Sequence, residues 1–199
     1  MAAAESRTAR VRRQTSETDI DLELGLDGSG RCAADTGIGF FDHMLDAFAR
    51  HGLFDLELRC RGDLEVDQHH TVEDVGICLG QALDRALGDR AGIQRFAHSY
   101  VPMDEALARV VVDLSGRSYL CAAPEFRDTG VGDFPVSLVV EFFRAVSDHG
   151  RFNLHVDLLR SGNDHHGIEA IFKAFAQALD RATLRTGRSD SIPSTKGRL

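Results

Sequence analysis

Apolar and polar positions alternate with a period of two at the start of the chain. This alternation over residues 8–14 and again over 18–26 predicts two half-buried strands. A Ser-Gly pair at 29–30 predicts a tight turn into a further short strand near 31–34. A run of mixed polarity with apolar residues over 53–60 predicts one more strand. The opening third of the chain is therefore expected to form a small sheet.

In two later segments, the apolar residues recur with the spacing of a helix. Apolar residues at helical spacing from Phe40 to Phe48 predict a helix of about three turns. We expect it to end at His51 and Gly52, with the histidine in the last turn and the glycine as the C-cap. A second helix is predicted over 69–87.

Four segments of this pattern occur again later in the chain, in the same order. The recurring segments are LDGSGR at 26–31 and VDLSGR at 112–117, RHGLFDL at 50–56 and DHGRFNL at 148–154, HHTVE at 69–73 and HHGIE at 165–169, and QALDRA at 81–86 and 177–182. An internal duplication explains this order best.

The duplication predicts an α+β fold in which each half is a small, mainly antiparallel sheet covered on one face by two helices. We expect one half over residues 1–94 and the other over 95–190, joined in one compact unit. The tail over 191–199 follows. The last thirteen residues, GRSDSIPSTKGRL, are polar and rich in Gly, Pro and Ser, so composition predicts a flexible end.

Charge and cysteine usage limit the function classes. A net charge of −8 argues against nucleic acid or an anionic membrane as the main partner, because both require a basic face. The sequence contains neither an apolar run long enough to span a membrane nor a secretory signal. The four cysteines are far apart and form no C-x-x-C pair, which fits a reducing cytoplasm.

The motif H-H-x-x-E occurs twice, each time at the start of a predicted helix. In the first copy, Glu73 lies on the same side of the helix as His69 and His70, whereas the two imidazoles are about 100° apart around the axis. One helix is therefore expected to present ligands to two different metal ions. The alternative, histidines that only cap the helix or pack under the sheet, does not require the same polar residues at both repeat positions.

Aligning the ends of the first helix of each half places His43 opposite Glu141, and both are residue types that bind divalent metals. Imidazole and carboxylate donors without cysteine suit Mn, Fe, Ni, Co or Zn. Four candidates from each half provide enough ligands for two sites. The eight candidate ligands are His43, His69, His70, Glu73, Glu141, His165, His166 and Glu169.

The other histidines receive structural interpretations. His51 and His149 lie where a cation favours a helix C-terminus. His98 and His155 fall in predicted strands, away from the H-H-x-x-E motifs.

Basic residues form a second candidate cluster, suited to an anion. Lys173 lies two turns after His165 on the same predicted helix, and Arg and Lys together are typical of a phosphate site. Alone, each of these cations is a solvated surface charge, and only their association with the metal cluster favours binding. The candidates are Arg95, Arg117, Lys173, Ser194 and Lys196.

Taken together, these segments resemble the imidazoleglycerol-phosphate dehydratase family over about residues 10–199. The segments that carry the resemblance are FDHMLDAFARHG, DQHHTVED, PMDE at 102–105, DLSGR, EFFRA, NDHHGIEAIFKAFAQAL and PSTKG. The resemblance implies a duplicated α+β half-domain and loss of water from D-erythro-imidazole glycerol phosphate, giving imidazole acetol phosphate in histidine biosynthesis. It also implies dependence on Mn(II), here two ions per subunit, and assembly into a cubic shell of twenty-four subunits.

The resemblance also assigns roles. It implies that the same eight residues bind metal and that the five anion candidates bind the substrate phosphate. Glu17 is placed against the substrate, and His43, His51, His69 and His165 are further expected substrate contacts. Glu141 departs from the family pattern, since many members have His there.

The C–H bond to be broken is not acidic, because no carbonyl is adjacent, so an electron sink is needed. A metal-bound imidazolate of the substrate is expected to provide it. Glu17, Glu73 or Glu169 then moves the protons.

Two other function classes stay open on the residues alone. A dinuclear metal-dependent phosphoester hydrolase would also combine metals with an anion site. A non-catalytic metal-binding cage would use the ligands but has no need for Ser194, Lys196 or Glu17.

Two structural expectations follow from the order of these residues. The two H-H-x-x-E motifs start far apart in sequence, so we expect the sites to be completed between subunits. We also expect the tail to close on the substrate phosphate as part of the active site.

Overall fold

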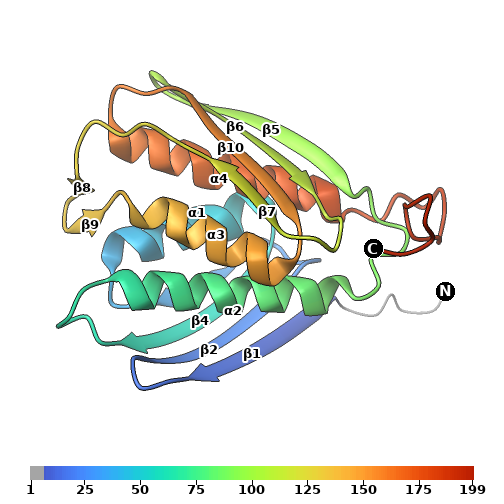
Figure 1. The fold of residues 1–199 in the computed structure, drawn as a ribbon, viewed down its shortest axis with the longest axis horizontal. Helices are drawn as coiled ribbons and strands as arrows, with labels where there is room; N and C mark the ends of the chain where they lie inside the picture. Colours follow the sequence, from blue (N-terminus) through green and yellow to red (C-terminus); the bar gives the residue numbers. More distant parts are fainter. Residues whose placement is uncertain (1–6) are drawn as a thin grey trace.

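The computed structural model describes residues 7–199, and its elements follow one another twice in the same order (Figure 1). The first half contains β1 (Thr8–Gln14), β2 (Thr18–Gly25), β3 (Cys32–Asp35), α1 (Gly39–Gly52), β4 (Asp55–Gly62) and α2 (His69–Leu87). The second contains β5 (Phe96–Met103), β6 (Ala106–Asp113), β7 (Tyr119–Ala122), α3 (Leu138–Gly150), β10 (Asn153–Arg160) and α4 (Asp164–Thr183). A hairpin of β8 (Gly130–Val131) and β9 (Phe134–Pro135) is inserted before α3.

Each half forms a four-stranded sheet of the same topology. The strand order is β1-β2-β4-β3 in one sheet and β5-β6-β10-β7 in the other. Pairing is antiparallel except at one edge, where β3 runs parallel to β4 and β7 runs parallel to β10. The predicted class, a duplicated α+β fold with mainly antiparallel sheets, is confirmed.

The two N-terminal hairpins match residue for residue. Gln14 pairs with Asp19 in the first half, and Pro102 pairs with Leu107, each 88 residues further along, in the second. The turns that follow β1 and β5 therefore have the same length.

The four helices fill the space between the two sheets (Figure 1). Helix α2 packs on β1 and β2, and α4 packs on β5 and β6. Across the halves, α2 lies against α3 and α1 lies against α4, so the halves meet helix to helix. Within residues 7–199, none of these helices has the length and apolarity to cross a membrane.

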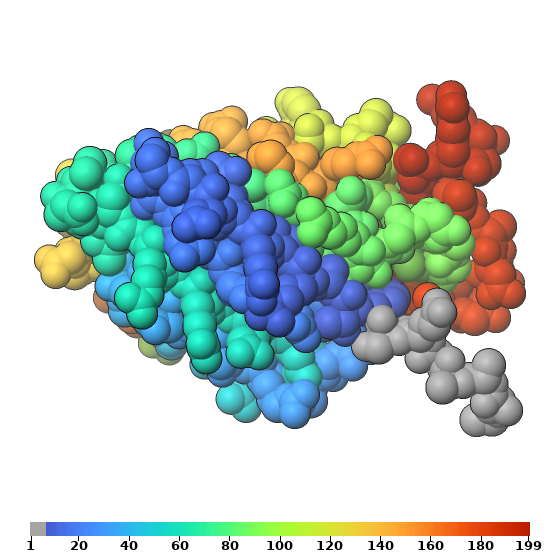
Figure 2. Space-filling view, turned by 90° about the horizontal axis from the view of Figure 1, so that it is seen from below, coloured from blue at the N-terminus to red at the C-terminus, as the bar shows by residue number. Residues whose placement is uncertain are grey.

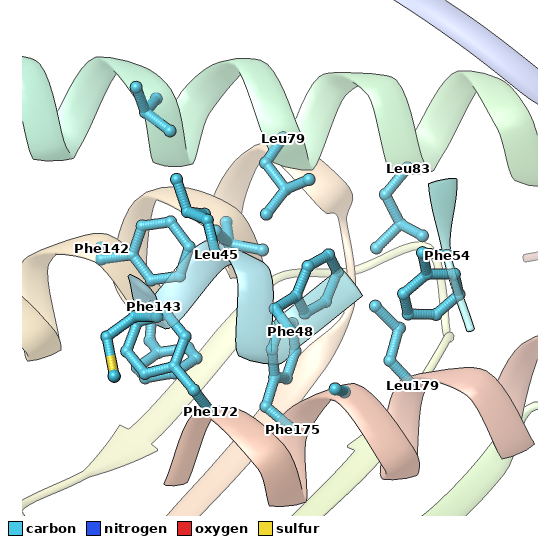
Figure 3. Packing of buried hydrophobic residues seen from close by; sticks show 14 of the residues in the cluster. Leu45, Phe48, Phe54, Leu79, Leu83, Phe142, Phe143, Phe172, Phe175 and Leu179 are labelled. Carbon is cyan, nitrogen blue, oxygen red and sulfur yellow. The ribbon is translucent and has the colours of Figure 1, made fainter. Parts of the chain in front are cut away.

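Phenylalanine rings fill the contact between the helices (Figure 3). Phe48 of α1 stacks on Phe175 of α4 with ring centroids 5.5 Å apart, and Phe41 of α1 meets Phe142 of α3 edge-on at 5.3 Å. All four side chains are buried. Aromatic pairs at such distances add about 0.5–1.5 kcal/mol beyond the burial of their area. The two halves therefore share one hydrophobic core.

Helix α1 extends through Gly52, which the sequence predicts as its C-cap, and α3 extends through the matching Gly150. The residues with left-handed backbone are Leu53 (φ 55°) and Arg151 (φ 54°), one position later. A Cβ on Gly52 would lie 2.4 Å from the Phe54 ring, and a Cβ on Gly150 would lie 2.6 Å from the Phe152 ring. Close packing, not a positive φ, accounts for these two glycines.

Asp55 at the start of β4 holds the loop between β2 and β3. Its carboxylate accepts hydrogen bonds from the backbone N–H groups of Ser29 and Arg31 and pairs with the Arg31 guanidinium at 2.5 Å. The Arg31 side chain, followed by the Ser29 N–H, holds the pKa of Asp55 well below its ordinary range.

We expect Asp55→Asn to lower the free energy of unfolding by about 1–2 kcal/mol at neutral pH, because the neutral amide loses these charge-assisted bonds. A carboxylate with a lowered pKa stabilises the fold above its unfolded pKa, and this contribution is lost as the pH falls through the folded value. The difference between variant and parent should therefore shrink below about pH 4. Urea unfolding over a pH series measures it. A difference that does not change with pH would contradict this origin.

Candidate active site

The N-terminal ends of α1, α2 and α4 lie at the same end of the molecule, on the left in Figure 1. His69 and His70 open α2, and His165 and His166 lie in the first turn of α4. The rings of each pair are 6.2 Å apart, with planes at 74° in α2 and 82° in α4. As the helical step predicts, each pair presents one imidazole to each of two different surroundings.

One group of candidate ligands joins the two halves within a single chain. His43 Nε2 of α1 and His165 Nε2 of α4 lie 3.3 and 3.2 Å from the same oxygen, Oε2 of Glu169. Glu169 is only 7% exposed, whereas His43 faces solvent. Two imidazoles and a buried carboxylate form a donor set that suits a divalent first-row transition metal.

Lys173 completes the surroundings of Glu169. Its Nζ lies 2.6 Å from Oε1, one turn along α4. Burial raises the pKa of Glu169, but Lys173 and His43 outweigh that effect, so the pKa lies below its ordinary value. The carboxylate is therefore ionised at neutral pH.

The matching residues on α2 and α3 do not form such a group. His69 Nε2 lies 3.8 Å from Glu73 Oε2, one turn along α2. Glu141 pairs instead with Arg144, its neighbour on α3, at 3.4 Å. Within residues 7–199, Glu141 joins no compact cluster of three candidate ligands. The duplication predicts the position of Glu141 but not its ion pair with Arg144.

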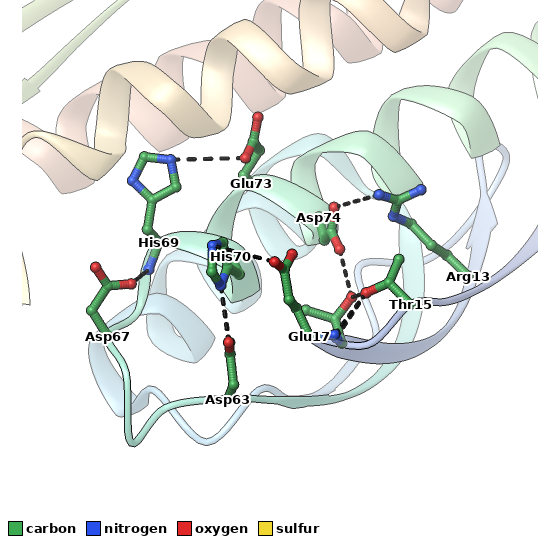
Figure 4. A network of polar contacts seen from close by, with 10 residues as sticks. Arg13, Thr15, Glu17, Asp63, Asp67, His69, His70, Glu73 and Asp74 are labelled. Atoms are coloured by element: carbon green, nitrogen blue, oxygen red, sulfur yellow. Dashed lines mark hydrogen bonds and ion pairs between the residues drawn. The ribbon is translucent and has the colours of Figure 1, made fainter.

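The second imidazole of α2 faces two carboxylates (Figure 4). His70 Nδ1 lies 3.0 Å from Asp63 Oδ2, and its Nε2 lies 3.8 Å from Glu17 Oε1. The hydrogen bond with Asp63 raises the pKa of His70. A carboxylate on one ring nitrogen fixes the orientation of the other, here towards Glu17.

The second half also places two carboxylates beside its second imidazole, but both lie nearest Nδ1 and both come from the hairpin turn. His166 Nδ1 lies 3.0 Å from Glu105 Oε2 and 3.9 Å from Asp104, and these three residues form a second candidate metal group. Glu105 lies 88 residues after Glu17, at the same position of the hairpin turn.

Three residues of these surroundings are not among the predicted site residues, because the recurring sequence segments do not include the hairpins or the loop before α2. They are Asp63, Asp104 and Glu105. Aligning the hairpins as well would have identified Glu105.

Four of the five anion candidates lie elsewhere. Arg95, Arg117, Ser194 and Lys196 line one pocket formed by the turns around β5 and by the C-terminal tail. We call it the anion pocket. The tail lies at one end of the molecule, red in Figure 2.

The anion pocket is far from the ligands of the same chain. The backbone N–H of Arg95 donates to Ala182 near the C-terminal end of α4, whereas His165 lies in its first turn. The intervening helix is about 25 Å long. Within one chain, the structure therefore does not bring the anion pocket to the candidate ligands.

The fifth anion candidate, Lys173, lies beside Glu169 and not in the anion pocket. His51 lies in the last turn of α1, as expected. Burial, followed by the charge of Lys173, lowers the pKa of His51.

The tail is held more closely than its composition predicts. Arg95 Nη1 donates to the carbonyl of Pro193 at 2.7 Å, and the N–H of Gly92 donates to Ser191 at 3.0 Å. Arg95 Nε in turn binds Asp113 at 2.7 Å. Backbone hydrogen bonds, which composition does not reveal, replace the missing apolar contacts.

Comparisons with known proteins agree on one family. Residues 36–179 match the family model described as imidazoleglycerol-phosphate dehydratase. The imidazoleglycerol-phosphate dehydratase of Salinibacter ruber is 58% identical over 193 residues, which cover 97% of this chain and 96% of that protein. The corresponding protein of Chloroflexus aurantiacus is 57% identical, covering 96% of this chain and 94% of its own.

Solved structures give the same result. The crystal structure of imidazoleglycerol-phosphate dehydratase from Staphylococcus aureus superimposes with a TM-score of 0.82 at 41% identity, over 90% of this chain and 99% of that one. The enzyme structure from Pyrococcus furiosus gives a TM-score of 0.80 at 37% identity, over 95% of this chain and all of that one.

We expect Glu169→Gln to weaken the binding of a divalent transition metal by more than about tenfold, because it removes the one ionised carboxylate that both His43 and His165 contact. Titration of chelator-treated protein with Mn(II) measures the affinity. Glu57→Gln, the same exchange at an exposed position of β4, serves as the control. Equal affinity in the two variants would exclude Glu169 as a ligand.

Proposed function

Because this chain belongs to the imidazoleglycerol-phosphate dehydratase family, we propose that its active site combines the ligand end of one copy with the anion pocket of another. The activity is the dehydration of D-erythro-imidazole glycerol phosphate to imidazole acetol phosphate in histidine biosynthesis. Neither a phosphoester hydrolase nor a metal-binding cage finds support in these relationships.

The group of His43, His165 and Glu169 is the observation that carries the proposal for metal binding. Its imidazole and carboxylate donors fit Mn(II), and we assign two ions to each chain. The other predicted ligands, His69, His70, Glu73, Glu141 and His166, complete these sites together with a neighbouring copy. A bound divalent cation would act as a Lewis acid on the substrate imidazole.

Proton transfer is assigned to Glu17. Its carboxylate faces His70 at 3.8 Å and is half exposed, so substrate can reach it. Glu169 is less suited to move a proton, because His43, His165 and Lys173 already engage both of its oxygens. Glu73 lies beside His69 and is assigned to metal binding.

Phosphate binding is assigned to the anion pocket and to Lys173. The pocket is lined by three arginines (Arg95, Arg117 and Arg198), Lys196 and Ser194, and these guanidinium, ammonium and hydroxyl groups match the donors that a phosphate requires. Because about 25 Å of α4 separates this pocket from His165 in one chain, substrate would reach both only between copies. This argument supports a large homo-oligomer, of which the shell of twenty-four subunits is the proposed form.

Deleting residues 193–199 is expected to reduce kcat/KM strongly while metal content stays at the parental level, because no candidate ligand lies in the tail. Each lost charge-assisted contact weakens transition-state binding by about 1.5–3 kcal/mol, which is about one to two decades in rate. The ultraviolet absorbance of the enolising ketone product in the presence of Mn(II) reports turnover, and elemental analysis reports metal. Parental kcat/KM in the truncated protein would remove Ser194 and Lys196 from the phosphate site.

Mixing two inactive variants tests whether a site spans two copies. Glu169→Gln damages the ligand end, and deletion of 193–199 damages the anion pocket at the other end of the chain. Coexpressed in one oligomer, the two variants are expected to regain part of the parental activity, because some sites receive both intact ends. If each site lay within one chain, coexpression would restore nothing.

A further inference from the structure

A buried carboxylate lies beneath the turn that carries Glu17 (Figure 4). Asp74 of α2 is 6% exposed. Its Oδ2 accepts a hydrogen bond of 2.5 Å from the Thr18 hydroxyl at the start of β2, and its Oδ1 lies 2.9 Å from the Arg13 guanidinium of β1. Both oxygens are therefore bound by the two strands that flank the turn.

Thr15 connects this carboxylate to Glu17. The Thr15 hydroxyl oxygen accepts hydrogen bonds from the backbone N–H groups of Glu17 and Thr18, at 3.1 and 3.0 Å. It lies 3.3 Å from the Thr18 hydroxyl, which already donates to Asp74. A continuous line of hydrogen bonds therefore runs from Asp74 to the backbone of Glu17.

Asp63, which orients His70, also holds the backbone of Glu17 from the other side. The N–H of Asp63 donates to the Glu17 carbonyl at 3.0 Å, and the Asp63 carboxylate binds His70. The backbone of Glu17 is thus fixed between two supports, one of which ends at Asp74.

The duplication supplies an internal comparison. The positions of Arg13 and Thr18 in the first hairpin correspond to Val101 and Ala106 in the second, and Asp74 corresponds to Ala170 in the repeated helix motif. These three residues are 8%, 1% and 0% exposed.

The same fold therefore packs small apolar side chains where the first half has a buried carboxylate, a buried hydroxyl and a guanidinium whose side chain is 35% exposed. Replacing a charge pair in the interior by apolar residues of fitting size is often neutral or stabilising. The fold does not explain why the first half keeps these polar residues.

We propose that Asp74, with Arg13 and Thr18, is a positioning group that holds Glu17 in the place required for proton transfer. It acts through Thr18 and Thr15 on the backbone of Glu17 and does not touch the substrate. The inference rests on the role given to Glu17 under the proposed function.

The test replaces these three polar residues of the first half by the residues at the equivalent positions of the second half. The variant Arg13→Val, Thr18→Ala, Asp74→Ala is expected to keep its fold, metal content and particle size. Its kcat should fall by about 100-fold, because misplacing a catalytic group by about 1 Å has that effect, while KM stays near the parental value. A parental kcat in this folded variant would overturn the proposal.

A matched pair of single variants covers the case in which the triple variant does not fold. Thr18→Ser keeps the hydroxyl and should keep the parental kcat, whereas Thr18→Val has the same size without it and should lower kcat. The loss should disappear when Thr18→Val is made in a Glu17→Gln background, because a positioning residue acts only through the group it positions. A loss of equal size in both backgrounds would show a merely structural effect and overturn the proposal.

Glu17→Gln alone separates the two levels of inference. If this variant keeps the parental kcat, Glu17 does not transfer the proton, and the positioning role proposed for Asp74 is then wrong as well. If Glu17→Gln lowers kcat to a small but measurable residual value while Thr18→Val keeps the parental kcat, only the positioning role is wrong.

Discussion

The contact between α1 and the helices of the second half is the interaction on which the candidate metal group depends. Phe48 stacks on Phe175 in the core, and Phe40, at the start of α1, meets the His165 ring edge-on at 5.1 Å. These contacts fix α1 against α4 so that His43 reaches Glu169, 126 residues away. Loss of this packing would move these side chains apart even if all three candidate ligands, His43, His165 and Glu169, were unchanged. The packing of the core therefore sets the positions of the candidate metal ligands.

The two halves use the same scaffold for different chemistry. Both begin their second helix with H-H-x-x-E, and both place a glutamate of the hairpin beside the second histidine. Only the second half has a lysine one turn after the motif, Lys173, where the first has Ile77. At the position of the buried Asp74 of the first half, the second half has the buried Ala170. Differences at a few positions on the same scaffold therefore give the two halves different polar surroundings.

Much of this arrangement is present in the sequence pattern. Alternation and helical spacing predict the strands and helices of the first half to within about two residues, since the period of burial is a local property, but they do not predict the β8–β9 hairpin of the second half. The repeat predicts which residues of the two halves are equivalent, and so selects His43 and Glu141 as a matched pair of candidate ligands. Glu141 shows the limit, because in the structure its carboxylate pairs with Arg144 on its own helix and not with the other candidate ligands. Asp63 shows a second limit, since its approach to His70 depends on the path of the loop between β4 and α2.

The helix-to-helix contact between the halves also bears on how such a chain arose. A single half would present the apolar faces of two helices to water, because its sheet covers only their other side. Such a half is expected to persist only by pairing with a copy of itself through those faces. The present protein then corresponds to a homodimer whose partners have become one gene product. Fusion freed the two copies to diverge, since a substitution no longer had to suit both sides of a symmetric pair.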